Sequence, residues 1–233
     1  MLTQQSQRSL QHPWLKPIGR AVLAIMMGVY GQMIIAISVW YVLGSPEQFS
    51  LAFEFGIKIA LLVMECSVFI LLVVDKEPLK KYINLLSPRR IIISGFLASI
   101  PLVIANRVMY GWIIRIFHGE FVYYRQLSGS NLAGVLFLLL QVGYYFFEVF
   151  VLVYAYAKLA EGLRTWRSLP RWGVVVIGGI FLFATWSLAH GFVVTSLMKF
   201  SIGLYLPFAF VLLYELAGSQ LAPAITWFLF VFV

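Results

Sequence analysis

Long apolar runs dominate this sequence, and several of them have the length that a helix needs to cross a lipid bilayer. Such a helix takes about 20 mostly apolar residues, because each residue advances it by about 1.5 Å. We therefore expect an all-α fold, a polytopic transmembrane bundle with about seven spans and a range of about six to eight. The expected spans are approximately residues 21–44, 49–74, 91–104 (or onward through Arg107 to 116), 131–157, 172–195, 200–216 and 221–233.

Composition supports this fold class and excludes two others. Hydrophobic residues make up 62% of the chain and charged residues 11%, whereas an ordinary soluble domain is roughly half apolar and about a quarter charged. These values exclude a cytosolic globular enzyme and a disordered chain. The first apolar run is too long for the core of a signal peptide and lacks a small-x-small cleavage pattern, so we expect a retained first span.

The distribution of positive charge predicts an orientation in the membrane. A net charge of +8 could indicate a nucleic-acid partner, but the lysines and arginines cluster at the ends of the apolar runs. There they contact anionic lipid headgroups, so we expect a lipid bilayer and no nucleic acid as partner. With the N-terminus in the cytoplasm, twelve lysines and arginines fall inside and four outside. We therefore expect a multi-pass protein of the cell membrane with a cytoplasmic N-terminus.

Three charged residues share one face of the second expected span. Glu54 and Lys58 are four residues apart in the favourable order, and Glu65 follows Glu54 after about three helical turns. This stripe could form an ion or proton path in a small transporter subunit. The interpretation that we favour is a salt-bridged stripe that packs against another helix, with Arg107 as a further partner.

Glu148 and His190 are the candidate functional residues of the fourth and fifth spans. Glu148 has no basic residue within one helical turn, while Tyr144 and Gln141 lie on its face one and two turns back. Such a carboxyl suits general acid–base chemistry, or it is a protonated group hydrogen-bonded across helices. His190, in the segment that begins at Trp186, is either a packing residue or the partner of Glu148 in a membrane cavity.

No pattern in the chain predicts a cofactor or a metal. The lone cysteine, Cys66, excludes an internal disulfide and a cysteine-based metal site, and we expect it to be a small buried apolar residue. Glu148 and His190 are two groups, whereas catalytic zinc usually has three protein ligands. The sequence contains no H-E-x-x-H, G-x-S-x-G, P-loop or dinucleotide fingerprint. We therefore expect neither a cofactor nor a metal.

Three short motifs in the last hundred residues resemble a known family. They are Tyr144-Tyr-Phe-Phe-Glu148, Trp186-Ser-Leu-Ala-His190 and Leu216-Ala-Gly-Ser-Gln-Leu-Ala-Pro-Ala-Ile-Thr226. In order and spacing they resemble the CPBP family (CAAX proteases and bacteriocin-processing enzymes, also called Abi), which are intramembrane glutamic proteases. The resemblance divides the chain into N-terminal membrane helices, residues 1–130, and a CPBP-like helical core, residues 131–233. It implies that Glu148 activates water, that His190 stabilises the oxyanion, and that the substrate is a membrane peptide or protein.

The match is incomplete at several motif positions. Phe147 and Val149 flank Glu148 where the family carries a second glutamate, Thr226 stands where a late histidine is expected, and Phe230 stands where an asparagine is expected. One hypothesis is a divergent membrane endopeptidase with Glu148 as general base and His190 as its partner. The alternative is a catalytically inactive scaffold or regulator that binds a partner protein, and a further alternative is the small transporter subunit described above.

The expected span boundaries also predict the depths of the two site residues. Glu148 would lie about nine residues, roughly 14 Å, from the inner end of its helix. His190 would lie about eighteen residues, roughly 27 Å, from the same side. On these boundaries the two side chains are mismatched in depth and do not share a site.

Overall fold

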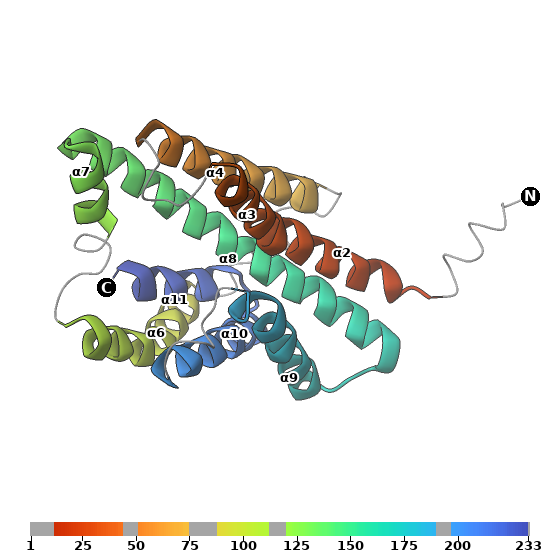
Figure 1. Ribbon diagram of the computed structural model, residues 1–233. Coiled ribbons are helices and arrows are strands. Elements are labelled where there is room, and N and C mark those ends of the chain that lie inside the picture. Colours follow the sequence, from red (N-terminus) through yellow and green to blue (C-terminus); the bar gives the residue numbers. More distant parts are fainter. Residues whose placement is uncertain (1–11, 44–50, 75–87, 112–119, 190–196, 233) are drawn as a thin grey trace, which may run out of the picture.

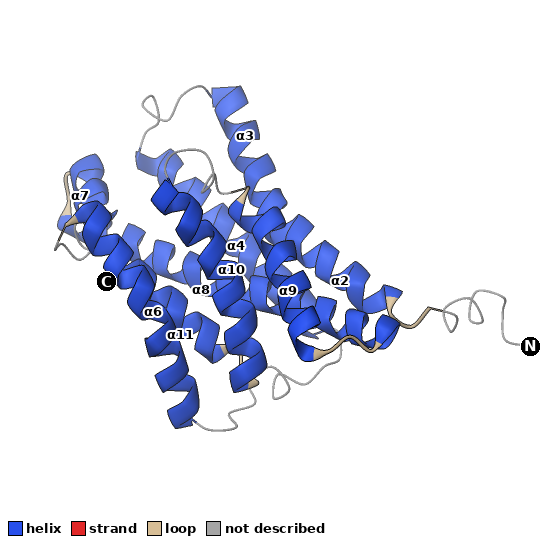
Figure 2. Ribbon diagram, turned by 90° about the horizontal axis from the view of Figure 1, so that it is seen from below, coloured by secondary structure: helices blue, strands red, loops and turns tan. Residues whose placement is uncertain are grey.

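All regular structure in the described part of the chain is helical. The computed structural model describes residues 12–43, 51–74, 88–111, 120–189 and 197–232, and Figures 1 and 2 show helices joined by short loops within these ranges. This confirms the expected all-α fold. In chain order the elements are α2 (Leu15–Ile25), the π-helical turn η1 (Met26–Tyr30), α3 (Gly31–Leu43), α4 (Leu51–Val74), α6 (Pro88–Tyr110), α7 (Val122–Ser128), α8 (Asn131–Arg167), α9 (Arg171–Leu182), the π-helical turn η4 (Phe183–Ser187), α10 (Leu197–Ala217) and α11 (Leu221–Phe232).

Five of these helical segments are long and apolar enough to cross a membrane, so the chain has the helices of a membrane protein. Two further apolar helices, Arg171–Ser187 and Leu221–Phe230, are shorter than 18 residues. Large apolar side chains such as Ile34, Leu132 and Trp172 are exposed on the outside of the bundle, where lipid would cover them. The five long segments are Leu15–Val39, Leu51–Val73, Pro88–Val108, Asn131–Arg167 and Leu197–Ala217.

The fourth expected span is ten residues longer than its apolar run indicated. We expected it to end near residue 157 and residues 158–171 to form a loop, but α8 continues to Arg167. Residues 158–167 are mostly strong helix formers, so polarity alone does not end the helix. It ends at Ser168, which adopts a left-handed backbone conformation with φ 48°, two residues before Pro170, which cannot continue a helix. The third span likewise extends to Tyr110 and includes Arg107.

Helix α8 is the central element of the bundle. In Figure 1 it runs through the molecule with α2, α3 and α4 on one side and α6, α9, α10 and α11 on the other. Helices α2 and α4 pack along it, and α9, α10 and α11 also contact it. The main hydrophobic core contains residues from both sides of α8, including Val29, Val68, Val153, Phe210 and Trp227. The division of the chain at residue 130 stays a prediction.

Glycines allow α2 to approach α8 closely. A Cβ atom at Gly28 would lie 2.6 Å from Val151 Cγ1, and one at Gly162 would lie 2.5 Å from Ile18 Cγ1. These two contacts show that α2 and α8 run antiparallel. Without a strong hydrophobic drive between helices in lipid, such small residues are what let helix backbones pack together.

Helix α4 lies along α8 in the same direction. The Phe55 ring contacts the Phe137 ring at a centroid distance of 5.2 Å, and the Phe69 ring contacts the Phe150 ring at 5.8 Å.

A hydrogen bond also connects two helices on the other side of α8, namely α6 and α10. The Tyr205 hydroxyl of α10 donates to the Ala98 carbonyl of α6 at 2.8 Å.

The close packing of α2 on α8 predicts the effect of a single methyl group. In Gly162→Ala the new methyl meets Ile18 and the Trp14 carbonyl oxygen, which is 3.0 Å from the Cβ position. In the control Gly19→Ala, on α2, nothing lies within 4 Å of the Cβ position. Both changes gain similar helix propensity, so we expect Gly162→Ala to be less stable than Gly19→Ala by about 1–3 kcal/mol. Thermal unfolding in detergent measures the difference, and equal stabilities would contradict this packing.

Candidate functional site

Glu148 lies near the middle of α8 with its side chain turned into the bundle. The residue is 4% exposed. The Trp186 indole Nε1–H donates to Glu148 Oε1 at 3.0 Å, and the Tyr144 hydroxyl, one turn back on α8, lies 3.4 Å from the same oxygen. These two groups supply the hydrogen-bond donors that a buried carboxyl group needs.

Tyr144 connects Glu148 to the first span. Its hydroxyl also lies 2.7 Å from Gln32 Oε1 on α3. A hydroxyl has one hydrogen, so Tyr144 donates either to Gln32 or to Glu148 at a given moment. The Gln32 Nε2 atom is buried and has no hydrogen-bond partner among the described residues. The three side chains thus form a short polar path from α3 to Glu148.

A second carboxyl, that of Glu65 on α4, belongs to the same cluster. Glu65 is 0% exposed, and neither of its carboxyl oxygens has a hydrogen-bond partner in the described part of the chain. Glu148 acts on Glu65 electrostatically, and both carboxyls act on the Tyr144 hydroxyl. The cluster therefore holds two glutamates from different helices. Sequence reasoning missed this pair because it assigned Glu65 to the charge stripe of its own helix.

The charge stripe of α4 is divided between two environments. Lys58 Nζ donates to Gln141 Oε1 of α8 at 2.6 Å and lies 5.9 Å from the centroid of the Tyr124 ring. The carboxyls that act on Lys58 are those of Glu120 and Glu54. Glu65 lies seven residues further along α4, about 10 Å away at 1.5 Å per residue. The stripe does pack against another helix, as we favoured, but Lys58 is not the partner of Glu65.

The π-helical turns η1 and η4 flank the cluster. Turn η4 contains Trp186, and η1 ends two residues before Gln32. A π-helical turn adds a residue to a helix and rotates the side chains that follow it, and such turns occur frequently at functional sites. Turn η4, which follows α9, contains Trp186, whose indole donates to Glu148.

The helix boundary from which the depth of Glu148 was predicted is wrong, while the depth of His190 is not tested. Because α8 extends to Arg167, Glu148 lies nineteen residues from its C-terminal end rather than nine. Trp186 lies fifteen residues after Arg171, where α9 begins, and it reaches Glu148 directly. The two motif segments therefore meet at the level of Trp186. His190 lies outside the described residues.

Two motif positions that depart from the family pattern serve helix packing. The Thr226 hydroxyl is 3.1 Å from the carbonyl oxygens of both Gly95 and Ala222. The Phe230 side chain is buried, and its backbone carbonyl accepts a hydrogen bond from Asn106 Nδ2 at 2.6 Å. The bonds to Gly95 and from Asn106 join α11 to α6.

One pocket of the described residues lies away from Glu148, between two other helices. A mostly apolar pocket of about 560 Å³ lies between α6 and α10, lined by residues such as Leu102, Ile202 and Tyr205. No group of three or more histidine, cysteine, aspartate or glutamate side chains within the described ranges could hold a metal ion.

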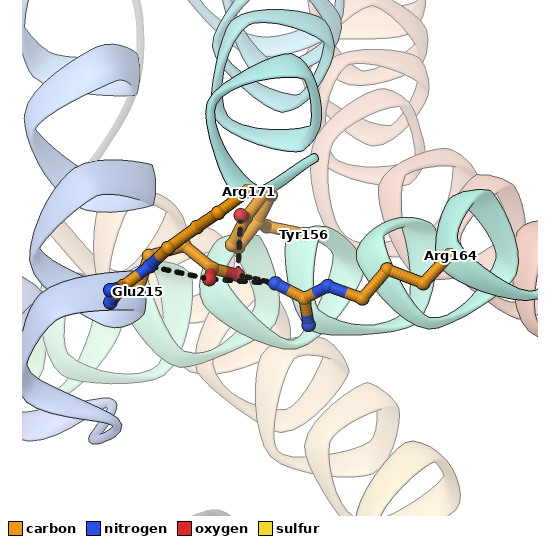
Figure 3. A network of polar contacts seen from close by, with 4 residues as sticks. All are labelled: Tyr156, Arg164, Arg171 and Glu215. Atoms are coloured by element: carbon orange, nitrogen blue, oxygen red, sulfur yellow. Dashed lines mark hydrogen bonds and ion pairs between the residues drawn. The ribbon is translucent and has the colours of Figure 1, made fainter. Parts of the chain in front are cut away.

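A separate ion cluster joins three helices at one end of the bundle. Figure 3 shows Arg164 and Arg171 reaching the Glu215 carboxyl from different helices. Arg164 Nη2 lies 2.6 Å from both carboxyl oxygens, Arg171 Nε lies 3.4 Å from Oε2, and the Tyr156 hydroxyl donates to Oε1 at 2.8 Å. The cluster places the ends of α8 and α10 and the start of α9 together.

The indole bond to Glu148 predicts a difference between two buried tryptophans. Trp186→Phe removes one donor of Glu148, while the control Trp227→Phe removes a buried indole N–H that has no hydrogen-bond partner in the described part of the chain. We expect Trp186→Phe to lose about 1–3 kcal/mol more stability than Trp227→Phe. Thermal unfolding of both variants in detergent tests this, and an equal loss would mean that the bond contributes nothing.

The ion cluster predicts a difference between two arginines in the last turn of α8. Arg164→Gln removes the shortest contacts of Glu215, whereas the Arg167 guanidinium stacks on the Trp166 ring. We expect Arg164→Gln to lose about 1–2 kcal/mol and Arg167→Gln less than about 0.5 kcal/mol. Unfolding at low and high salt provides the measurement. A loss for Arg167→Gln as large as that for Arg164→Gln would rule out a special role for the cluster.

Comparisons of this chain with protein-family models, with curated proteins and with solved structures find no match. The assignment to the CPBP family therefore stays a prediction based on the three motifs. The described geometry adds an independent fact, which is that the glutamate of the first motif and the tryptophan of the second are hydrogen-bonded to each other.

Proposed function

We propose that this chain is a divergent CPBP-like endopeptidase of the cell membrane, with a cytoplasmic N-terminus and Glu148 as general base. In this proposal Glu148 takes a proton from a water molecule, whose oxygen attacks the carbonyl carbon of a membrane peptide or protein. His190 is its partner and stabilises the negative charge that develops on the carbonyl oxygen. The reaction needs no cofactor.

The observation that carries this proposal is the bond between Trp186 and Glu148. Trp186 is the first residue of the motif that ends in His190, and Glu148 is the last residue of the motif before it. A hydrogen bond of 3.0 Å joins the two motif segments deep in the bundle. Glu65 adds a second buried carboxyl group, which is electrostatically coupled to Glu148.

A second candidate function is a membrane scaffold or regulator that binds a partner protein without catalysis. Two observations favour it. The Thr226 and Phe230 positions take part in packing α11 against α6, and the pocket between α6 and α10 is not lined by Glu148.

Substitutions at the two site residues separate these functions. We expect Glu148→Gln and His190→Ala each to lower cleavage by at least about 100-fold, as loss of an acid–base group does. Glutamine keeps an oxygen that accepts from Trp186 but cannot take a proton. The measurement is mass spectrometry of new peptide termini in membranes of cells that express each variant, and Arg167→Gln serves as control.

The opposite result would support the scaffold. If wild type and Glu148→Gln yield the same termini while both fold, the endopeptidase proposal is wrong. A scaffold predicts that Glu148→Ala changes the proteins that co-purify with the chain and leaves the termini unchanged.

A further inference from the structure

We propose that Glu65 and Glu148 form one proton-binding site inside the bundle, in which Glu65 is the carboxylic acid and Glu148 the carboxylate. The pair is supplied by two helices, α4 and α8, and holds a single proton. This site goes beyond the proposed endopeptidase, because it binds its proton whether or not the chain cleaves peptides.

Glu65 is 0% exposed, and neither of its carboxyl oxygens has a hydrogen-bond donor among the residues that the structure describes. A buried carboxylate without hydrogen bonds or a countercharge is costly by several kcal/mol, so such a group takes up a proton instead. Glu65 is thus the member of the pair that is neutral.

The surroundings of Glu148 differ from those of Glu65. Its Oε1 accepts from the Trp186 indole at 3.0 Å and is within 3.4 Å of the Tyr144 hydroxyl. Donors of this kind stabilise the charged form of a carboxyl. Two adjacent carboxyls with unequal donors divide their protons unequally, as in pairs that share one proton.

The charge of the pair also depends on the other titratable groups around it. Lys58 is bound to Gln141, about two turns away along α4. Within the described residues, the other titratable groups that interact with Glu65 are Tyr144 of α8 and Cys66 of α4 itself, both neutral in their ordinary state. The ion pairs in that part of the chain join Lys158 to Glu161 and Arg164 and Arg171 to Glu215, and none of them involves Glu65.

The contact between Gln32 and Tyr144 is an observation that does not depend on the two carboxyl groups. Gln32 of α3 is buried with its Nε2 atom unpartnered, and its Oε1 lies 2.7 Å from the Tyr144 hydroxyl. Rotation of that hydroxyl from Gln32 toward Glu148 would add a second donor to the carboxylate. The Gln32–Tyr144 pair therefore allows the cluster to adjust when the proton moves between the two carboxyls.

Dicyclohexylcarbodiimide, an apolar reagent that modifies protonated carboxyls in apolar surroundings, tests the site. The acid proton moves to a carbodiimide nitrogen and the carboxyl oxygen bonds to the central carbon, which gives an acylisourea that rearranges to a stable acylurea. The full chain in detergent near neutral pH is treated, digested and mapped by mass spectrometry. We expect one modified residue in the pair, Glu65, with the peptide of half-exposed Glu161 as an internal unmodified control.

Two variants complete the experiment. In Glu148→Gln we expect Glu65 to remain modified, and in Glu65→Gln we expect modification of the pair to disappear, because Glu148 keeps its donors and its charge. Glu65→Gln replaces a neutral acid by a neutral amide, so its melting temperature should stay within about 2 °C of wild type. This check shows that a lost signal does not come from unfolding.

Three results would overturn the proposal. These are an unmodified Glu65 in the folded wild type, equal modification of Glu65 and Glu148, and protection of Glu65 by added Na⁺ or K⁺, which would indicate a metal-cation site. None of these readouts depends on peptide cleavage, so the proton site and the endopeptidase proposal can fail separately.

Discussion

The burial of polar side chains along α8 is the constraint on which the arrangement of this bundle depends. Gln141, Tyr144 and Glu148 lie on one stripe of the helix, and within a hydrocarbon layer water cannot satisfy their hydrogen bonds. Each finds a partner on another helix, namely Lys58 of α4, Gln32 of α3 and Trp186 of η4. These three bonds set the depth and rotation of their helices relative to α8, while glycines such as Gly28 and Gly162 allow close backbone approach.

Along this polar stripe Gln141 accepts a hydrogen bond from the Lys58 ammonium, and Glu148 accepts from the Trp186 indole. At the level of Glu148 the Glu65 carboxyl is electrostatically coupled to it, and within the described residues the donors bond to Glu148 and not to Glu65. An arrangement that leaves one acid without donors is costly for packing, which is the usual sign that a site serves a purpose other than stability. Both proposed functions draw on this level, the endopeptidase through the carboxylate and the scaffold through the packing of its helices.

Much of the fold could be predicted from the chain because lipid leaves few choices. Apolar runs of sufficient length must be helices, and those runs were located correctly, but their ends were not. Residues 158–167 contain lysine, glutamate and arginine and resembled a loop, yet α8 continues through them. Polar residues mark where a helix leaves apolar surroundings, whereas the helix itself ends only where the backbone is interrupted, here before Pro170. The predicted depth of Glu148 in its helix was wrong for that reason.

By itself the sequence determined that this is an all-α membrane protein, that Glu148 faces inward, and that Tyr144 and Gln141 share its face, since helical periodicity relates residues within one helix. Only the tertiary structure decided that Trp186 donates to Glu148, that Gln32 adjoins Tyr144, and that Glu65 is the second carboxyl rather than the end of a salt-bridged stripe. The reason is that contacts between helices depend on their relative depth and rotation. The depth and rotation of each helix are set jointly by all the surfaces that pack in the bundle. They are also affected by the π-helical turns η1 and η4, which no local sequence pattern predicted.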